Sequence, residues 1–372
     1  MKHTFKNFSY VAFGKFFSRG VYSVFYLIIA TFLDPSILGQ ISYLMAIAGT
    51  ASVISRFGLP LSTIVYRAKQ QHDLANKLNL LALISSGIAS LILLTIDLYA
   101  ALLCFGLTSF LMNTNNLIGL KKYKKFFWES FTRSVSIIII PILLYFFFDV
   151  PGVILGLGIG NILGSTTLFK SLSLKIQSFR DVKASSKVLM NNFSVEASSS
   201  ITRWIDKLLI VPLYGFAFAG LYQFNLQILF ALMLLPNSLH VFLLSEKSGG
   251  NVSSRISSLT IIATVLLVIS VIVLSPYLID LLFPKYEEGI PSLQILIISL
   301  IPLSFTAILN ANFQSNESTK VVYPVMVKIG SLLVFLTIFG EVYGLAGLSI
   351  AFLFSTILET IFLLILYRRY KS

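Results

Sequence analysis

The sequence predicts an all-α polytopic membrane protein with about twelve transmembrane helices. Apolar stretches recur along nearly the whole chain of 372 residues, only 12% of the residues are charged, and the mean hydropathy is +0.88. Soluble domains carry about 25% charged residues. A bilayer is crossed by roughly 20 apolar residues, and four stretches without any charge satisfy this: 78–96, 99–120, 150–169 and 256–279. No large water-soluble domain fits in such a chain.

Interruptions of the apolar pattern by Pro, Gly and charged residues set the ends of the predicted helices. The uncharged run 208–245 is too long for one span, so we divide it at the turn 212–215. An odd number of spans would move the C-terminus to the opposite side of the membrane. The predicted helices are 11–33, 37–66, 78–96, 99–119, 131–148, 151–169, 190–212, 216–244, 257–281, 290–313, 322–340 and 344–367.

The distribution of Lys and Arg between the loops supports this count, because short cytoplasmic loops carry an excess of both. With the N-terminus inside, the inner segments hold twenty Lys and Arg residues, whereas the outer turns hold only Lys285 among six acids. Both termini are therefore expected in the cytoplasm. Topology and contact with anionic membrane lipids account for the net charge of +13 without a nucleic-acid partner.

The two halves of the chain resemble each other weakly. Residues 33–40 are similar to 214–223, and residues 149–152 are similar to 341–344, at offsets of about 180 to 190 residues. Many transporters place paired repeats around a central site. We predict two six-helix lobes, 1–169 and 190–372, joined by a basic cytoplasmic linker at 170–189, although chance similarity of apolar sequence is an alternative. The linker is either an amphipathic segment in the inner interface or a solvated connection.

Charged residues within the predicted spans indicate the function. Ionisable groups at membrane depth usually face a cavity or a partner. Seven basic residues there exceed four acids by three, and a cavity with this balance favours an anion, since guanidinium groups bind phosphate oxygens in pairs. The basic residues are Lys15, Arg19, Arg56, Arg133, Arg203, Lys207 and Lys328, and the acids are Glu196, Asp206, Asp280 and Glu359.

Helical spacing places many of these residues on common faces. The first helix presents Lys15, Arg19, Tyr22 and Tyr26; the seventh presents Asn192, Glu196, Ser199, Ser200, Arg203 and Lys207, with Asp206 at the edge. Arg56 in the second helix lies at a depth similar to that of Arg19. We expect the three helices to line one water-filled space in which Arg19, Arg56, Arg203 and Lys207 contact the anion. Two other outcomes are open: Arg133 and Lys15 extend to the inner interface, and Lys328 pairs with Glu359.

No sequence pattern indicates catalysis. The chain has no P-loop motif, its single Cys104 excludes a disulfide framework, and its three His residues are scattered. We therefore expect a transporter and not an enzyme, with no catalytic residue, no metal site and no cofactor. Transport would then draw on an ion gradient, a partner protein or removal of the product.

Several short motifs, in this order, resemble the polysaccharide-repeat (O-antigen) flippases of the multidrug/oligosaccharidyl-lipid/polysaccharide (MOP) exporter superfamily. They lie at 34–39, 56–60, 206–210, 220–222, Pro236 and 281–286. The resemblance implies a MATE-like architecture, with two lobes around a central cationic cavity, in a bacterial inner membrane. It implies transfer of an undecaprenyl-diphosphate-linked oligosaccharide to the outer leaflet, with other polysaccharide assembly proteins as possible partners. Arg19, Arg56 and Arg203 would hold the diphosphate, and Tyr22 and Tyr26 would line the path of the sugar.

Other functions remain open. Glu196 and Asp206 either titrate in proton coupling or form salt bridges with Arg203 or Lys207. A drug or organic-cation antiporter of the same architecture would have a net acidic cavity and a carboxylate deep in its first helix, whereas the first acid of this chain is Asp34. An integral-membrane polysaccharide polymerase would need a large outer loop, and the longest outer turn predicted here is 284–289.

Overall fold

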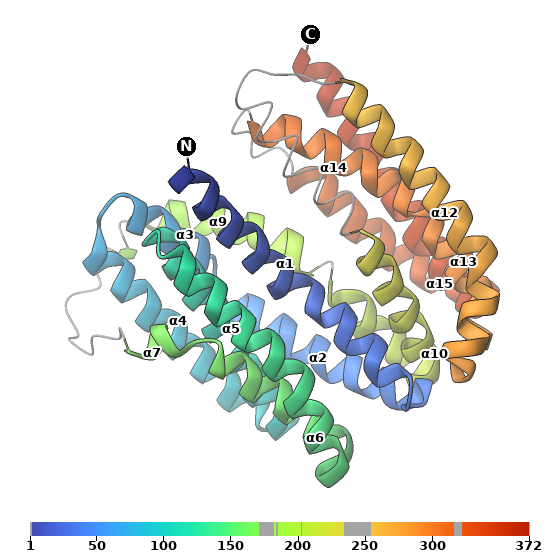
Figure 1. Cartoon of the computed structure of the whole chain (residues 1–372), viewed down its shortest axis with the longest axis horizontal. Coiled ribbons are helices and arrows are strands. Elements are labelled where there is room, and N and C mark those ends of the chain that lie inside the picture. The colour runs from blue at the N-terminus through green and yellow to red at the C-terminus, as the bar shows by residue number, and fades with distance from the viewer. Residues whose placement is uncertain are drawn as a thin grey trace. The chain divides into compact units, whose positions relative to one another are not determined.

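The computed structural model describes residues 2–170, 182–183, 185–201, 203–233, 254–315 and 322–371, and every regular element in these ranges is a helix (Figure 1). Eight helical stretches there are long and apolar enough to cross a membrane. The α-helices are α1 (Lys2–Ala30), α2 (Pro35–Arg56), α3 (Leu59–Ala68), α4 (His72–Leu93), α5 (Leu98–Gly119), α6 (Tyr123–Leu163), α7 (Thr166–Lys170), α9 (Ser186–Ile201), α10 (Ile205–Leu232), α12 (Ser254–Leu282), α13 (Ile290–Ile298), α14 (Leu300–Ser315) and α15 (Val322–Lys371). A 3₁₀ helix, η1, spans Pro284–Gly289.

Each of the twelve predicted helices overlaps a helix of the structure. α6 and α15, with 41 and 50 residues, are long enough for two spans each. Both contain one residue with non-helical backbone angles, Asp149 in α6 and Gly344 in α15, and α10 has such a residue at Gly215. These three interruptions confirm the predicted helix ends near 148, 340 and 212.

Several predicted boundaries were wrong. α1 begins at Lys2 instead of 11, and α4 begins at His72 instead of 78. The helix expected at 37–66 divides between α2 and α3, because Phe57 and Gly58 have positive φ angles of 38° and 72° and Pro60 at the start of α3 has no N–H to continue the helical ladder. The helix expected at 190–212 ends at Ile201 and resumes at Ile205. The helix expected at 290–313 divides at Ser299, and α6 begins at Tyr123 instead of 131.

The backbone forms two compact units. Unit one comprises 1–25 and 43–205, and unit two comprises 26–42 and 206–372. These borders differ from the predicted lobes, since 26–42 falls in unit two and α9 falls in unit one. Residues 171–181 of the predicted linker lie outside the described ranges. The division into lobes at 1–169 and 190–372 therefore stays a prediction.

In unit one, α6 folds back on itself along a ridge of small residues. Asp149 lies between its two arms, and a Cβ on any glycine of the ridge would come closer than 3.0 Å to the opposite arm. Small residues allow helices to approach this closely in membranes. The glycines Gly152, Gly156, Gly160 and Gly164 face Leu144, Pro141, Ile137 and Arg133 in turn.

In unit two, the second part of α10 forms the centre of the core. Nearly every residue from Ala219 to Leu229 is buried there. Tyr222 belongs to one apolar cluster with Leu296 of α13 and with Leu336 and Leu348 of α15. This part of the helix is therefore buried on all sides, and it encloses the amide side chains of Gln223, Asn225 and Gln227 as well as apolar ones.

Candidate functional site

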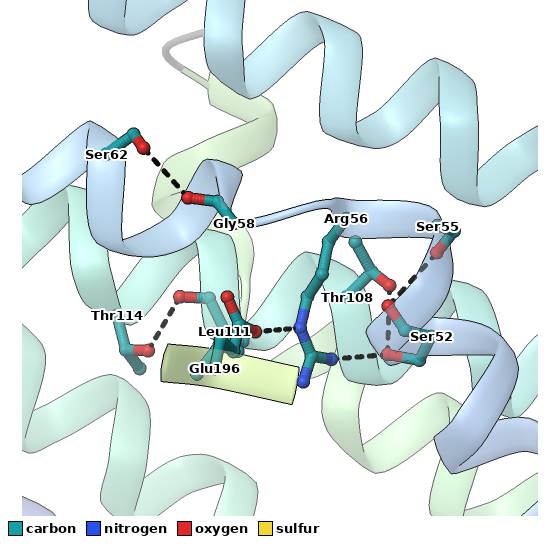
Figure 2. Close-up of polar contacts among 9 residues, drawn as sticks. All are labelled: Ser52, Ser55, Arg56, Gly58, Ser62, Thr108, Leu111, Thr114 and Glu196. Carbon is teal, nitrogen blue, oxygen red and sulfur yellow. Dashed lines mark hydrogen bonds and ion pairs between the residues drawn. The ribbon is translucent and has the colours of Figure 1, made fainter. Parts of the chain in front are cut away.

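Arg56 and Glu196 form a buried ion pair in unit one. Arg56 ends α2, and its Nε donates a hydrogen bond to Oε1 of Glu196 on α9 (Figure 2). Its Nη1 donates to Oγ of Ser52 at 2.6 Å, and that hydroxyl lies 3.1 Å from Oγ1 of Thr108 on α5. Arg56 is 6% exposed and Glu196 is 7% exposed. Two residues predicted for the site, from helices far apart in sequence, are thus in direct contact.

The break between α2 and α3 makes this contact possible. A Cβ on Gly58 would come within 3.0 Å of the backbone of Phe193 and Leu189, so the backbone of α9 lies directly against this glycine. The Phe57 ring stacks on that of Phe193 with centroids 4.5 Å apart. Asn192 Nδ2 donates to Ser62 Oγ of α3 at 2.8 Å. The polar face of α9 therefore binds both sides of the break.

The pair suits reversible binding of an anion. A guanidinium group presents a fixed fork of donors that matches carboxylate and phosphate oxygens alike. Removing one partner of a buried pair leaves a costly uncompensated charge. The Arg56 guanidinium can therefore hold either the Glu196 carboxylate or the oxygens of another anion.

A second cluster in unit one holds Tyr22 of α1. The Arg133 guanidinium lies 4.8 Å from the centroid of the Tyr22 ring and 4.2 Å from that of Phe110. Arg133 Nε donates to Asn161 Oδ1 at 2.8 Å, and Asn161 Nδ2 donates to the Tyr22 hydroxyl at 3.2 Å. Arg133 is 3% exposed, so it does not extend to the interface. Asn161 was missed, although it is the one amide within an otherwise apolar and glycine-rich span.

Glu129 lies one turn before Arg133, because α6 begins earlier than predicted. Its Oε1 accepts hydrogen bonds from the backbone N–H and the hydroxyl of Thr167 and from the hydroxyl of Thr166. Its Oε2 accepts one from the side-chain amide of Asn113. Arg67 of α3 is also buried, where its Nε donates to Asn116 Oδ1 at 2.7 Å. Among the described residues, the buried charged side chains are therefore five bases and four acids, a surplus of one positive charge. The bases are Arg56, Arg67, Arg133, Lys207 and Lys328, and the acids are Glu129, Glu196, Asp206 and Glu359.

Two further buried ion pairs lie among the described residues of unit two. Lys207 Nζ is 2.9 Å from Oδ1 of Asp206, and both residues are nearly inaccessible. Lys328 Nζ is 2.8 Å from Oε2 of Glu359, which confirms the pairing expected from sequence. Asp206 forms its salt bridge with Lys207, one of its two expected partners. Glu196 pairs with Arg56, which the sequence did not indicate as its partner.

The other predicted site residues lie as follows. Arg203 is exposed in the turn between α9 and α10, and Tyr26 is 3% exposed. Arg19, Ser199 and Ser200 belong to helices, but their side chains lie outside the described part of the structure. Their contact with a substrate stays a prediction. Unit one contains Arg19, Tyr22, Arg56, Glu196 and Arg203, and unit two contains Tyr26, Asp206 and Lys207.

Comparisons with known proteins identify the fold. No protein-family model matches the sequence. An uncharacterized membrane protein of Methanocaldococcus jannaschii is 23% identical, over 94% of this chain and 94% of its own length. An inward-facing MATE multidrug resistance transporter of the MOP superfamily aligns over 95% of this chain and 94% of its own, with a TM-score of 0.73 and 16% identity. The lipid II flippase MurJ, in an inward closed conformation, aligns over 96% and 78%, with a TM-score of 0.62 and 16% identity.

A third similar structure is a MOP superfamily transporter from Pyrococcus furiosus, whose description reports a reverse polarity of its binding pocket. It covers 98% of this chain and 95% of its own, with a TM-score of 0.58 and 15% identity. The chain is therefore an all-α, multi-pass membrane protein with the MOP transporter fold. This confirms the predicted fold class. The bacterial inner membrane and the O-antigen substrate stay predictions.

Proposed function

We propose that this protein is a transporter of anionic lipid-linked substrates. Its substrate is an undecaprenyl-diphosphate-linked oligosaccharide, which it moves from the cytoplasmic to the outer leaflet by alternating access. The observation that carries the proposal is the buried guanidinium of Arg56, which is held by a carboxylate that an incoming phosphate can replace. The excess of seven basic over four acidic residues in the predicted spans supports it.

The charge balance favours an anion because most buried acids already have a partner. Glu196, Asp206 and Glu359 each pair with one base. Glu129 is surrounded by hydroxyl and amide donors. A diphosphate brings negative charge into a positive surrounding of low dielectric constant, where each charge–charge attraction is much stronger than in water.

The proposed cycle begins with the diphosphate at the cytoplasmic side. Its oxygens take the Arg56 donors from Glu196, while Ser52 continues to orient the guanidinium. Release on the outer side restores the Arg56–Glu196 pair. The lipid tail stays in the bilayer, and Tyr22 and Tyr26 line the path of the sugar.

The known folds support both a lipid-linked and a drug substrate. One similar structure is a lipid II flippase, and another is a multidrug transporter. The higher TM-score, 0.73, belongs to the multidrug transporter, and an organic-cation antiporter is therefore the second candidate. The first helix distinguishes the two candidate substrates, since residues 2–33 contain no acid to bind a cation.

A reconstituted system tests the proposal. The full chain is placed in liposomes that contain fluorescent undecaprenyl diphosphate, and an impermeant quencher reports how much of the lipid has crossed. We expect transfer by the wild type and at least a tenfold slower rate for Arg56→Ala. The control is the double variant Lys328→Met/Glu359→Gln, which removes a buried pair of the same kind in unit two. Transport of an organic cation but not of the diphosphate lipid would overturn the proposal.

Cell-based complementation tests the sugar-bearing substrate. A bacterial strain without its own O-antigen flippase receives the wild type or Arg19→Ala, Arg56→Ala or Arg203→Ala at matched expression. We expect surface polysaccharide with the wild type and its loss with the variants. Rescue that all three substitutions leave intact would exclude the proposed arginine site.

A further inference from the structure

An open basic depression of about 490 Å³, which we call the cavity, lies on the surface at the turn between α5 and α6. Its lining residues come from one short stretch that includes the first two turns of α6. Four of the six carry an ammonium group and none carries an acid. They are Lys121, Lys122, Tyr123, Lys124, Lys125 and Trp128.

The positive charge of this cavity is not balanced within the described part of the chain. None of its four lysines has an acid within ion-pair distance there. α6 starts at the cavity with no side-chain cap and no acid in its first turn. The first N–H groups of a helix lack partners and carry a partial positive charge, so the helix end adds to the field of the lysines.

The backbone at Lys121 indicates that the turn does not require a charged side chain at this position. Lys121 has a φ of 57°, in the left-handed region where glycine is cheapest. Its N–H bonds to Ile118 O, and Lys122 N–H bonds to Leu117 O, both at 2.9 Å, as in a common helix end. The turn after α3 has the same left-handed backbone with Gln70 at a φ of 61°. A lysine is therefore not needed to form this turn.

Trp128 gives the cavity an aromatic side. It is 53% exposed, and its ring centroid lies 5.5 Å from that of Phe127 and 5.9 Å from that of Phe131. Trp side chains collect at the depth of lipid headgroups. The positive-inside rule accounts for lysines on this side of the membrane, but it does not account for an exposed tryptophan that lines the same depression as four of them.

We propose that this cavity binds the phosphate headgroup of an anionic phospholipid from the inner leaflet. A headgroup with two phosphates, as in cardiolipin, suits four ammonium groups better than a headgroup with one, and basic pockets on the cytoplasmic side of membrane proteins bind such lipids. The lysines and the free N–H groups of α6 donate to the phosphate oxygens. The Trp128 ring packs against the glycerol and the upper acyl chain. This site is separate from the transported substrate.

Native mass spectrometry of the full chain, released from nanodiscs of defined lipid composition, tests the site. We expect the wild type to retain cardiolipin in preference to phosphatidylcholine. Each lysine removed is expected to weaken retention about fivefold. Lys121→Gly is the most informative variant, since it removes a charge and relieves the left-handed backbone. Lys124→Gln/Lys125→Gln extends the series.

Two control variants separate charge from backbone effects. Gln70→Gly makes the same backbone change at the turn after α3 without altering charge, and Lys69→Gln removes a lysine from that turn. Both are expected to retain cardiolipin as the wild type does. Equal retention of cardiolipin and phosphatidylcholine by the wild type, or unchanged retention by Lys121→Gly, would overturn the proposal.

A competition arm identifies the source of the phosphate. Undecaprenyl diphosphate is added to cardiolipin-bound wild type. Persistence of bound cardiolipin supports a phospholipid site, whereas displacement would assign the cavity to the transported lipid and overturn this proposal. The liposome assay with fluorescent undecaprenyl diphosphate then reports transport separately, so failure of one proposal does not imply failure of the other.

Discussion

Gly39 of α2 and Gly220 of α10 bring the two helix backbones into reciprocal contact. A Cβ on Gly39 would lie closer than 3.0 Å to the carbonyl oxygen of Phe216, and a Cβ on Gly220 would lie equally close to that of Pro35. Gly220 follows Gly39 by 181 positions, and Phe216 follows Pro35 by the same number. The two contacts are therefore equivalent under the predicted internal repeat, which places each half's glycine against the other half's helix start.

A second pair of equivalent positions corrects the predicted alignment of the two halves. Asp149 and Gly344 share an unusual backbone, with φ of 51° and 57° and ψ of −139° and −132°. Gly152 lies against Leu144 O, and Gly347 lies in the same way against Phe339 O. These pairs are offset by 195 positions, so the predicted match of 149–152 with 341–344 was wrong by three residues. Similar short apolar segments allowed the misalignment.

The glycine crossing gives a first prediction. Gly39→Ala and Gly220→Ala each force a methyl group into a backbone carbonyl, and such overpacking costs about 1–3 kcal/mol. We expect both variants to unfold at lower temperature in detergent. Gly87→Ala and Gly330→Ala are matched controls, because a Cβ at either helical position meets no atom within 4 Å. Equal melting temperatures for all four variants would contradict the crossing.

The repeat at Asp149 gives a second prediction. Asp149 is exposed and has a backbone that glycine adopts more readily, and its counterpart is Gly344. We expect Asp149→Gly to raise the free energy of unfolding by about 1 kcal/mol, because a residue in such a region stores about 1–3 kcal/mol and glycine loses about 0.5–1 kcal/mol of chain entropy. The reverse change, Gly344→Ala, is expected to destabilise. Thermal unfolding checks the pair, since we expect a higher melting temperature for Asp149→Gly and a lower one for Gly344→Ala. Changes in the same direction would refute the equivalence of the two positions.

The buried pair at Arg56 gives a third prediction. Arg56→Ala leaves Glu196 buried without its partner, which costs roughly 3–5 kcal/mol. The double variant Arg56→Met/Glu196→Gln is expected to be more stable than Arg56→Ala, because no isolated charge remains. A double-mutant cycle compares the melting temperatures of the wild type, Arg56→Met, Glu196→Gln and the double variant, and it measures the coupling between the two residues. Additive effects of the two single changes would show that the contact contributes nothing.

The outer turn gives a prediction for pH. A shared hydrogen bond with Asp280, together with some burial and the negative charge of Asp280, raises the pKa of Glu287 above 4.5. The folded chain thus favours protonated Glu287, so the contribution of this bond is present below pH 4.5 and is lost as the pH rises through the raised folded pKa.

Glu287→Gln keeps a hydrogen-bond donor at every pH, and this variant tests the assignment. Between about pH 4 and pH 7, we expect the melting temperature of the wild type to fall relative to that of Glu287→Gln. Glu288→Gln, a change at the adjacent exposed acid, is the control and is expected to follow the wild type. A constant difference between the wild type and Glu287→Gln across this range would count against the shared proton.

The helices could be predicted from sequence because each span must satisfy its own backbone and match the bilayer thickness. Hydropathy, together with the Pro, Gly and charged residues that interrupt it, therefore placed each of the twelve predicted helices on a helix of the described residues and indicated the interruptions near Asp149, Gly215 and Gly344. The ends were less certain where a helix extends beyond the apolar run. α6 starts at Tyr123 since its first two turns pack as an aromatic cluster with α1, through contacts such as Phe17 with Phe127, and no apolar count reveals this.

The sequence by itself determined that this chain is a multi-pass helical membrane protein with a surplus of buried positive charge, because length, hydropathy and charge are properties of single segments. Only the tertiary structure decided which charges meet. The Arg56–Glu196 contact joins residues 140 positions apart, and the Arg133–Tyr22 contact depends on how α6 folds against α1. Partners of buried charges are chosen by packing between helices, and periodicity within one helix carries no information about its neighbours.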